Sequence, residues 1–313
     1  MNDGGAEMAA DDPRGDAEES VKARGAGSDV ETSGAPTARR IVLGAQLRRL
    51  REAADISRAD AGYQIRGSDS KISRMELGRV GFKERDVADL LTMYGVTDGG
   101  ERSVFLEMVR KSNERGWWHR YTDTMPDWFQ DYVGLEESAS LIQTFELQFV
   151  PGLLQTEEYI RAVTGRGHPE RLDAAGERRV RLRLQRQKVL SRAGAPRLWA
   201  VIDESVLHRP IGGPAVLRRQ LDHLLEVTRQ PNVTLQVVPN DRSGYSAEGA
   251  FSVLRFAEPA LPDVVYIEHL AGALYLDRPN EIEQYGRAID HLAVDAETPD
   301  RSRQLVSKIR AEL

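Results

Sequence analysis

Four short amphipathic segments between residues 41 and 94 constrain the fold more than any other feature of this sequence. The first segment begins at Ile41. It carries one apolar stripe at helical period, formed by Leu43, Leu47, Leu50 and Ala54. Arg51 lies outside this stripe, on the polar side of the predicted helix.

The next three segments carry start and stop signals for helices. Ser57, followed by Asp60 three residues later, predicts the N-cap of a second helix. Gly67 and the serine after it end that helix, and residues 69–77 predict a third. Residues 83–94 predict a fourth. Four short helices in fewer than 60 residues, with a tight turn between the second and third, are typical of a helix-turn-helix domain.

Charge divides the chain into three parts. The chain has 313 residues, 43 Lys and Arg, 49 Asp and Glu, and a formal net charge of -6. Residues 1–38 hold nine acidic and three basic side chains and no aromatic, which predicts a disordered acidic tail. Residues 39–97 carry a net +4 and form the predicted helix-turn-helix DNA-binding domain. Residues 98–313 carry a net -4 and form a larger sensor or interaction domain.

The absence of cysteine excludes several classes of site. No disulfide, thiolate zinc site, iron-sulfur cluster or cysteine nucleophile can form. No segment approaches the roughly 18 apolar residues of a membrane span, and the acidic N-terminus lacks the features of a signal peptide. We therefore expect a cytoplasmic protein with no membrane partner, no metal and no cofactor.

The segment SDSKISRMELGR, residues 68–79, resembles the recognition helix of the Cro and phage-repressor-like (XRE) helix-turn-helix family. The resemblance extends from about Leu43 to Val96 and implies that the third helix enters the major groove of DNA. The sequence departs from the family pattern at four positions of the second helix and its turn, Arg58, Ala61, Gly62 and Arg66. We expect these departures to weaken the packing of the helix pair.

The implied docking places the first turn of the third helix against base edges. The base-reading residues predicted from it are Arg58, Asp69, Ser70, Lys71 and Arg74. The predicted phosphate contacts are Ser57, Arg79 and Lys83. For any one of these side chains, a solvated helix surface is the alternative interpretation. The predicted partner is double-stranded DNA, bound by a homodimer with two-fold symmetry.

Aromatic and basic side chains are concentrated in two places beyond residue 98. Six aromatics fall within 16 residues: Trp117, Trp118, Tyr121, Trp128, Phe129 and Tyr132. They can line a ligand pocket, but a core or domain seam is the favoured interpretation. A predicted helix over residues 174–192 is rich in arginine: Arg178, Arg179, Arg181, Arg183 and Arg186. It could form a second phosphate track, although a solvated or partner-binding face explains it as well.

Periodicity predicts a mixture of helices and strands for the rest of the chain. Helices are expected at residues 102–115, 135–144, 214–229, 280–294 and 299–311, and Thr156 is expected to cap a further one. Strands are expected at residues 198–202, 233–238, 251–256, 264–268 and 273–276. The fold class is therefore a mainly α N-terminal helix-turn-helix bundle followed by a larger α+β C-terminal domain.

Acid-base candidates are present, but they form no catalytic motif. They are Asp203, Glu204, His208, Glu268 and His269. Glu204 and His208 are four residues apart and could share a metal on a helix, yet a surface pair is the favoured interpretation. No nucleophile elbow, phosphate-binding loop, dinucleotide fingerprint or HExxH motif occurs, so we expect no enzyme.

A second resemblance covers nearly all of residues 98–313. Its phrases are ERGWWHRY, FVPGLLQTEEYIRA, RLWAVIDESVLHRPIGGPAVLRRQL, NVTLQVVP and VVYIEHLAGALYLD. They look like the uncharacterised C-terminal domain that follows an XRE-type helix-turn-helix in regulators of high-GC, filamentous Gram-positive bacteria. Those regulators are similar to antitoxin-like transcription factors and often pair with a small protein encoded nearby.

Three hypotheses follow from these features. The leading one is a sequence-specific, DNA-binding transcriptional regulator whose C-terminal domain dimerises, senses an effector or binds a small partner protein. The second is an antitoxin-like interaction module with a relic helix-turn-helix. The third is a small-molecule enzyme, which needs Asp203, Glu204 or Glu268 to converge in one pocket.

Overall fold

A computed structural model describes residues 36–165, 172–242 and 249–313. The predicted tail of residues 1–38 therefore lies outside the described residues, apart from its last three. Those three residues belong to helix α1 (Pro36–Ala53), which begins five residues before the predicted segment at Ile41.

The first five helices form one helical region, whereas the sequence predicted four of them and assigned the fifth, at residues 102–115, to the larger domain. They are α1, α2 (Arg58–Gln64), α3 (Asp69–Glu76), α4 (Glu84–Met93) and α5 (Gly99–Ser112). They share one hydrophobic core, which includes Leu43, Leu47, Ile72, Leu90 and Val109. Helices α2 and α3, with 7 and 8 residues, are too short to be stable alone in water, so this shared core is what holds them in a helical conformation.

The predicted stripe on α1 is wrong at its C-terminal end. Ala54 lies beyond the helix and is exposed, whereas Arg51 is only 9% exposed. Periodicity counts every arginine as polar and outward-facing, but Arg51 has a buried partner on α3.

The second half of the chain forms the predicted α+β structure around one six-stranded sheet. Its N-terminal elements are η1 (Trp117–Tyr121), α6 (Asp127–Ser138), β1 (Leu141–Glu146), η2 (Gly152–Leu154), α7 (Glu157–Thr164), α8 (Ala174–Gln187) and η4 (Lys188–Leu190). Next come β2 (Arg197–Asp203), α9 (Ser205–His208), α10 (Pro214–Val227) and β3 (Val233–Val238). The last are β4 (Phe251–Arg255), β5 (Val264–His269), β6 (Gly272–Leu276), α11 (Pro279–Asp295) and α12 (Pro299–Glu312).

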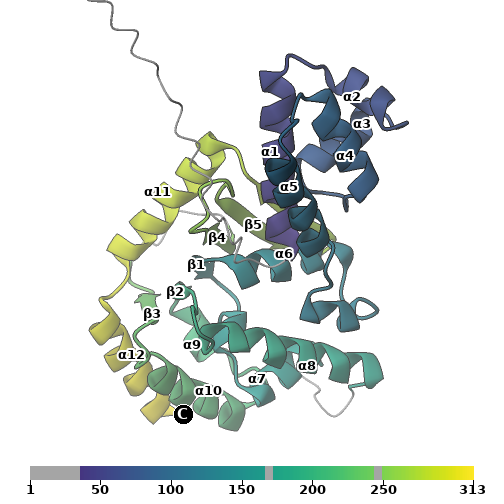
Figure 1. Cartoon of the computed structure of the whole chain (residues 1–313). Helices are drawn as coiled ribbons and strands as arrows, with labels where there is room; N and C mark the ends of the chain where they lie inside the picture. Colours follow the sequence, from purple (N-terminus) through teal and green to yellow (C-terminus); the bar gives the residue numbers. More distant parts are fainter. Residues whose placement is uncertain (1–35, 166–171, 243–248) are drawn as a thin grey trace, which may run out of the picture. The chain divides into compact units, whose positions relative to one another are not determined.

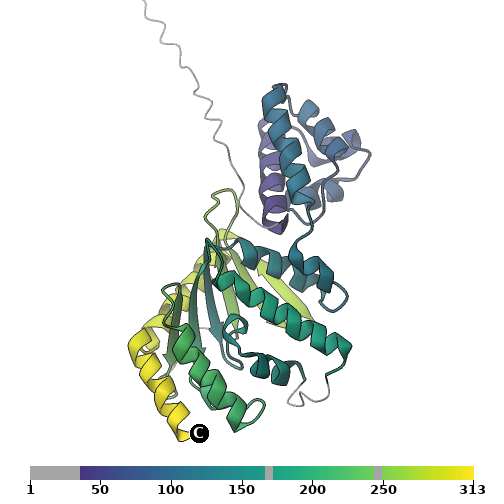
Figure 2. The same ribbon diagram turned by 60° about the horizontal axis from the view of Figure 1, so that its bottom comes forward.

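The sheet has the strand order β3-β2-β1-β4-β5-β6. Strands β1, β2 and β3 are parallel, and β4, β5 and β6 continue the sheet by antiparallel pairing. Helix α11 packs on one face of the sheet, and α6, α10 and α12 pack on the other (Figures 1 and 2). The sheet is therefore the middle of three layers.

The helix predicted over residues 135–144 is wrong after Ser138. Helix α6 ends at Ser138, and β1 follows at Leu141–Glu146. This strand pairs with β2 on one side and with β4 on the other, so its conformation depends on residues more than 50 positions away. All five predicted strands are confirmed, and β1 is the sixth.

Helix α6 lies between the helical core and the sheet. It contacts α1, where a Cβ on Gly134 would lie only 2.3 Å from the Thr37 hydroxyl oxygen. Its other side carries Tyr132 into the core above the sheet. Among the described helices, none has the length and apolar character needed to cross a membrane.

Candidate nucleic-acid interface

The turn between α2 and α3 is closed by two hydrogen bonds at the end of α2. The Gly67 N–H donates to the Gly62 carbonyl at 2.8 Å, and the Arg66 N–H donates to the Tyr63 carbonyl at 3.0 Å. This is the Schellman pattern, in which the residue after the helix cap adopts a left-handed conformation. Arg66 occupies that position with φ +53°, so a non-glycine residue bears the strain of the turn.

The expectation that Ala61 and Gly62 weaken the helix pair is wrong. Ala61 is fully buried, and a Cβ on Gly62 would lie 2.9 Å from the carbonyl carbon of Ser68. The backbone of the turn therefore approaches α2 more closely than a larger residue would allow. Ser68 then caps α3 by accepting a hydrogen bond from the Lys71 N–H at 3.2 Å.

A buried ion pair fixes α3 to α1. Arg51 donates to the Glu76 carboxylate at 2.6 Å and 3.2 Å, and both side chains are almost excluded from solvent. The hydrogen bond to Glu76 is the main cause that raises the pKa of Arg51 above its ordinary value. Arg51 also donates to the Ile56 carbonyl at 2.8 Å, which ties the α1–α2 connection to the same group. This pair was not predicted from the sequence. A signal was present, because Glu76 lies four residues after Ile72 and therefore on the apolar face of the predicted helix.

Three of the five predicted base-reading residues are exposed on α3. Asp69 and Ser70 lie in its first turn. Arg74 follows one turn later, with its Nε donating to the Ser70 carbonyl at 3.3 Å. Arg74 forms no ion pair with any described residue, so its guanidinium is available to a guanine or a phosphate.

The other two predicted base-reading residues have ionic partners. Arg58 lies 3.1 Å from Asp69, and both side chains are about half exposed. Such a surface pair contributes at most about 1 kcal/mol, so DNA can displace it. Lys71 is held more firmly, because its ammonium lies 2.6 Å from the mostly buried Asp86 carboxylate on α4. The ion pair of Lys71 therefore connects α3 to α4, and its ammonium is not an unpaired cation on the surface.

The predicted phosphate contacts also divide into one residue that is bonded within the protein and two that have no ionic partner among the described residues. The Ser57 hydroxyl caps α2 by accepting from the Asp60 N–H at 3.1 Å, and it donates to the Asp60 carboxylate at 2.6 Å. The nearby Asp60 charge opposes a phosphate at this helix end. Arg79 and Lys83 are exposed, and neither forms an ion pair within the described part of the chain.

The six predicted aromatics separate into two groups. Trp117, Trp118 and Tyr121 form edge contacts on η1, with ring centroids 5.9 Å and 6.3 Å apart. Trp128, Phe129 and Tyr132 lie on α6. Trp118 and Tyr132 are buried in two different cores, so the six rings do not line one pocket.

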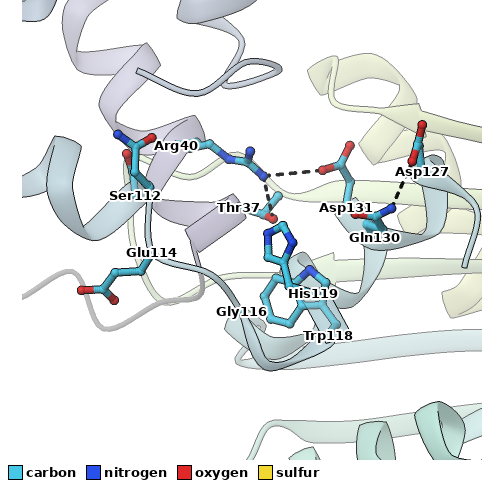
Figure 3. Close-up of a pocket in the computed structure, with 11 residues that line it drawn as sticks. Thr37, Arg40, Ser112, Glu114, Gly116, Trp118, His119, Asp127, Gln130 and Asp131 are labelled. Carbon is cyan, nitrogen blue, oxygen red and sulfur yellow. Dashed lines mark hydrogen bonds and ion pairs between the residues drawn. The ribbon is translucent and has the colours of Figure 1, made fainter. Parts of the chain in front are cut away.

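A polar cavity of about 290 Å³ lies beside Trp118, where α1, the end of α5, η1 and α6 meet (Figure 3). Within it, Arg40 donates to the Thr37 hydroxyl at 3.2 Å and lies 3.8 Å from Asp131. Burial raises the pKa of the Asp131 carboxyl, and the Arg40 charge opposes that rise. The cavity lies between α6 and α1, the first helix of the helical region.

The basic residues of α8 do not form one exposed track. Arg178 pairs with Asp123 at 2.7 Å. Arg186 pairs with the fully buried Glu136 at 2.6 Å. Arg183 is partly buried, and Arg179 and Arg181 are exposed. The burial and pairing of these side chains do not fit the second phosphate track.

The acid-base candidates of the C-terminal half are not brought together. Glu204 and His208 form the expected surface pair at 3.2 Å. Asp203 and Glu268 lie on strands three positions apart and on opposite faces of the sheet. Within residues 36–165, 172–242 and 249–313, no cluster of three or more carboxylate or histidine side chains could hold a metal.

Two capped helices around a tight turn, with an exposed second helix, define a helix-turn-helix protein. A family model described as a helix-turn-helix domain matches residues 42–105, which indicates a DNA-binding regulator. A second model, described as a domain of unknown function (DUF5753), matches residues 129–308. Because that match covers more than half of the sequence, the chain belongs to the DUF5753 family. No curated protein and no solved structure matches the chain significantly.

Proposed function

We propose that this protein is a sequence-specific, DNA-binding transcriptional regulator. The proposed DNA-binding module spans residues 39–97, and the regulatory domain spans residues 98–313. The observation that carries this proposal is the presentation of α3: its first turn and Arg74 are exposed, while its other side is anchored by the buried Arg51–Glu76 pair. A rigidly held helix with exposed polar groups is what readout of the major groove requires.

The unpaired cations support the same function. Arg74, Arg79 and Lys83 are exposed and lack ionic partners among the described residues. In this proposal Arg74 reads a base, while Arg79 and Lys83 contact phosphates. Asp69 accepts from a cytosine amino group once Arg58 is drawn away to the DNA.

The resemblance to Cro and phage-repressor-like regulators supports binding as a homodimer. Two-fold symmetry would then place the two recognition helices about 34 Å apart, on half-sites of a palindromic operator. The regulatory domain would carry the dimer contact, an effector site or the docking surface for a small protein encoded nearby. The proposed role of this domain is regulatory and not catalytic.

The test is binding of the full chain to the DNA upstream of its own gene, against random duplex of equal length. We expect at least a thousandfold preference for one palindromic site at physiological salt. Equal, strongly salt-dependent affinity for both duplexes would refute sequence-specific regulation.

The structure does not favour the alternative of a relic helix-turn-helix. It depended on a degraded second helix at Ala61, Gly62 and Arg66. The structure instead shows α2 capped at both ends and closely packed on the turn before α3.

A further inference from the structure

The polar cavity where α1, the end of α5, η1 and α6 meet is large enough for a small molecule (Figure 3). Its volume of about 290 Å³ corresponds to the liquid volume of roughly ten water molecules. A ligand that fills it has about the same number of non-hydrogen atoms. This volume lies near the lower end of the range for ligand sites, roughly 300 Å³.

The lining of the cavity disfavours apolar ligands. Among the described residues that line it, Trp118 is the only aromatic, and it is 4% exposed. A Cβ on Gly116 would lie 2.4 Å from the Trp118 ring, and one on Gly134 would lie 3.0 Å from it, so the backbone encloses the indole. Apart from Gly116, the other lining residues carry polar or charged side chains. A ligand in this cavity must therefore be held by hydrogen bonds.

Arg40 and Asp131 face each other in the cavity without a hydrogen bond between them. Their nearest nitrogen and oxygen are 3.8 Å apart, which is beyond hydrogen-bond distance. The Arg40 guanidinium has five N–H groups, and it makes one hydrogen bond with the described residues, to the Thr37 hydroxyl at 3.2 Å. The Asp131 carboxylate makes none with them. Both groups therefore have unused hydrogen-bonding capacity.

His119 and Gln130 add further groups of this kind. His119 is exposed, and its ring makes no hydrogen bond with any described residue. The Gln130 amide nitrogen donates to Asp127 at 3.1 Å, which leaves the amide oxygen as an unused acceptor. The cavity therefore offers N–H donors from Arg40, acceptors from Asp131 and Gln130, and an imidazole that can serve as either.

The charges around the cavity are balanced in pairs. Arg40 faces Asp131, and Glu114 is bound by Arg39 at 3.1 Å. Asp127 lies in the first turn of α6, where the helix dipole favours a negative charge. A ligand anion attracted by Arg40 would be repelled by Asp131, and a ligand cation would meet the reverse conflict. A neutral ligand avoids both.

From these contacts we infer that the cavity binds a small, neutral, polyhydroxylated molecule: a monosaccharide or linear polyol of about four to six carbons. Each hydroxyl donates one hydrogen bond and can accept two, so it suits a lining that offers both donors and acceptors. One hydroxyl accepts from the Arg40 guanidinium and donates to the Asp131 carboxylate, as an ordered water would across 3.8 Å. Other hydroxyls bond to His119 and Gln130.

This inference deepens the proposed regulatory function and rests on it for its biological meaning, because α1 is closely packed at both sides of its first turns. A Cβ on Gly134 of α6 would lie 2.3 Å from the Thr37 hydroxyl oxygen. A Cβ on Gly78, just after α3, would lie 2.7 Å from the Ile41 backbone. Because neither contact leaves room, a ligand that moves Arg40 shifts α1 against the end of α3.

The binding itself is tested without DNA. The full chain is titrated by calorimetry with a panel of neutral pentoses, hexoses and their alditols. We expect at least one of them to bind one-to-one with a Kd of about 1 mM or below. Thermal melting is not the readout, because polyols stabilise folded proteins in general by being excluded from their surfaces.

Charged analogues test the expected neutrality of the ligand. The aldonic acid and the amino sugar with the carbon skeleton of the selected ligand carry one negative and one positive charge. Each should bind the unmodified chain at least about tenfold more weakly, because each meets a like charge in the cavity.

Variants locate the site. Asp131→Asn removes a charged acceptor and should weaken binding about 10- to 100-fold, and His119→Ala should weaken it about 3- to 10-fold. Asp123→Asn is the matched control, because Asp123 is an exposed acid between η1 and α6 that pairs with Arg178 and does not line the cavity. A melting curve of each ligand-free variant verifies that it is folded.

Asp131→Asn also gives a readout that a structural role would not produce. It removes the charge that repels an anion and leaves Arg40 in place. The preference for the neutral sugar over its aldonic acid should therefore fall in this variant and stay unchanged in Asp123→Asn.

The inference is overturned if no neutral sugar or polyol binds, if the aldonic acid or the amino sugar binds the unmodified chain equally well, or if Asp123→Asn weakens binding as much as Asp131→Asn. Sugar or polyol binding that Asp131→Asn weakens, in a chain without specific DNA binding, would support this inference and refute only the regulatory proposal.

Discussion

Helices α3 and α8 both carry basic residues spaced at helical period, yet the structure uses their arginines in opposite ways. On α3, Arg74 is exposed and lacks an ionic partner among the described residues. On α8, Arg186 is buried against Glu136 and stacked on aromatic rings. The difference shows that a run of basic residues indicates a phosphate surface only where the side chains stay hydrated and unpaired.

The largest expected effect is a loss of protein stability when the buried Arg186–Glu136 pair is broken. Glu136→Gln leaves the Arg186 guanidinium without its counter-charge, which should lower the free energy of unfolding by about 3–5 kcal/mol, measured by urea denaturation. Glu283→Gln is the matched control, because Glu283 pairs with Arg287 on an exposed surface, and it should cost less than about 1 kcal/mol. Equal losses at the two sites would show that the Arg186 pair is not buried as described.

On α3 the effect should fall on DNA binding and leave stability unchanged. Arg74→Ala should weaken operator binding by about 1–3 kcal/mol and relax the preference at one base pair, measured against operators substituted at each position. Lys83→Ala should weaken specific and random duplexes equally and reduce the slope of log affinity against log salt by about one. If the two variants behave identically, Arg74 contacts a phosphate and does not read a base.

A pH-dependent effect distinguishes the partly buried carboxyl on the sheet from ordinary surface acids. The pKa of Glu146 is raised to about 7 in the folded protein, above the 4.5 of an unperturbed glutamate. Ionisation therefore costs stability progressively as pH rises from about 4.5 to 7, and the cost is constant above that range. Glu146→Gln avoids this cost, so it should stabilise the ligand-free protein by about 2 kcal/mol at pH 8 and by much less at pH 4.5. Thermal melting across this range checks the sign, and a gain that shrinks as pH rises would contradict it.

The smallest effect is expected at the turn that presents α3. Arg66 adopts φ +53°, so Arg66→Gly should remove left-handed strain and raise stability by about 1 kcal/mol. Asp55 has the same φ, but an acidic residue tolerates this conformation better, so Asp55→Gly should gain less. Chemical denaturation of both variants tests the order, and destabilisation by Arg66→Gly would show that its side chain makes a contact worth more than the strain.

The helix-turn-helix elements could be predicted because their signals lie within a few residues of one another. Ser57 was predicted to cap the second helix and does so, and Ser68, which was predicted to end that helix, caps the third. The ionic state of individual side chains could not be predicted in this way. Lys71 was expected to read bases, but it is tied to Asp86, which lies 15 residues away and was assigned to a different helix.

Strand β1 shows the same limit for the fold. Residues 141–144 were assigned to a helix, because nothing in their own composition reveals that two other strands flank them. The same missed strand ends at Glu146, so the partial burial of that carboxyl could not be predicted either.

The sequence by itself determined the helix-turn-helix module, the α+β class and most element positions, since periodicity, caps and turns are local properties of the chain. Only the tertiary structure decided which charges are exposed and which are held by a partner: Arg51 by Glu76, Arg186 by Glu136, and Lys71 by Asp86. The physical reason is that desolvation depends on packing between segments far apart in the chain, and the same arginine is a surface cation or a buried partner according to what covers it.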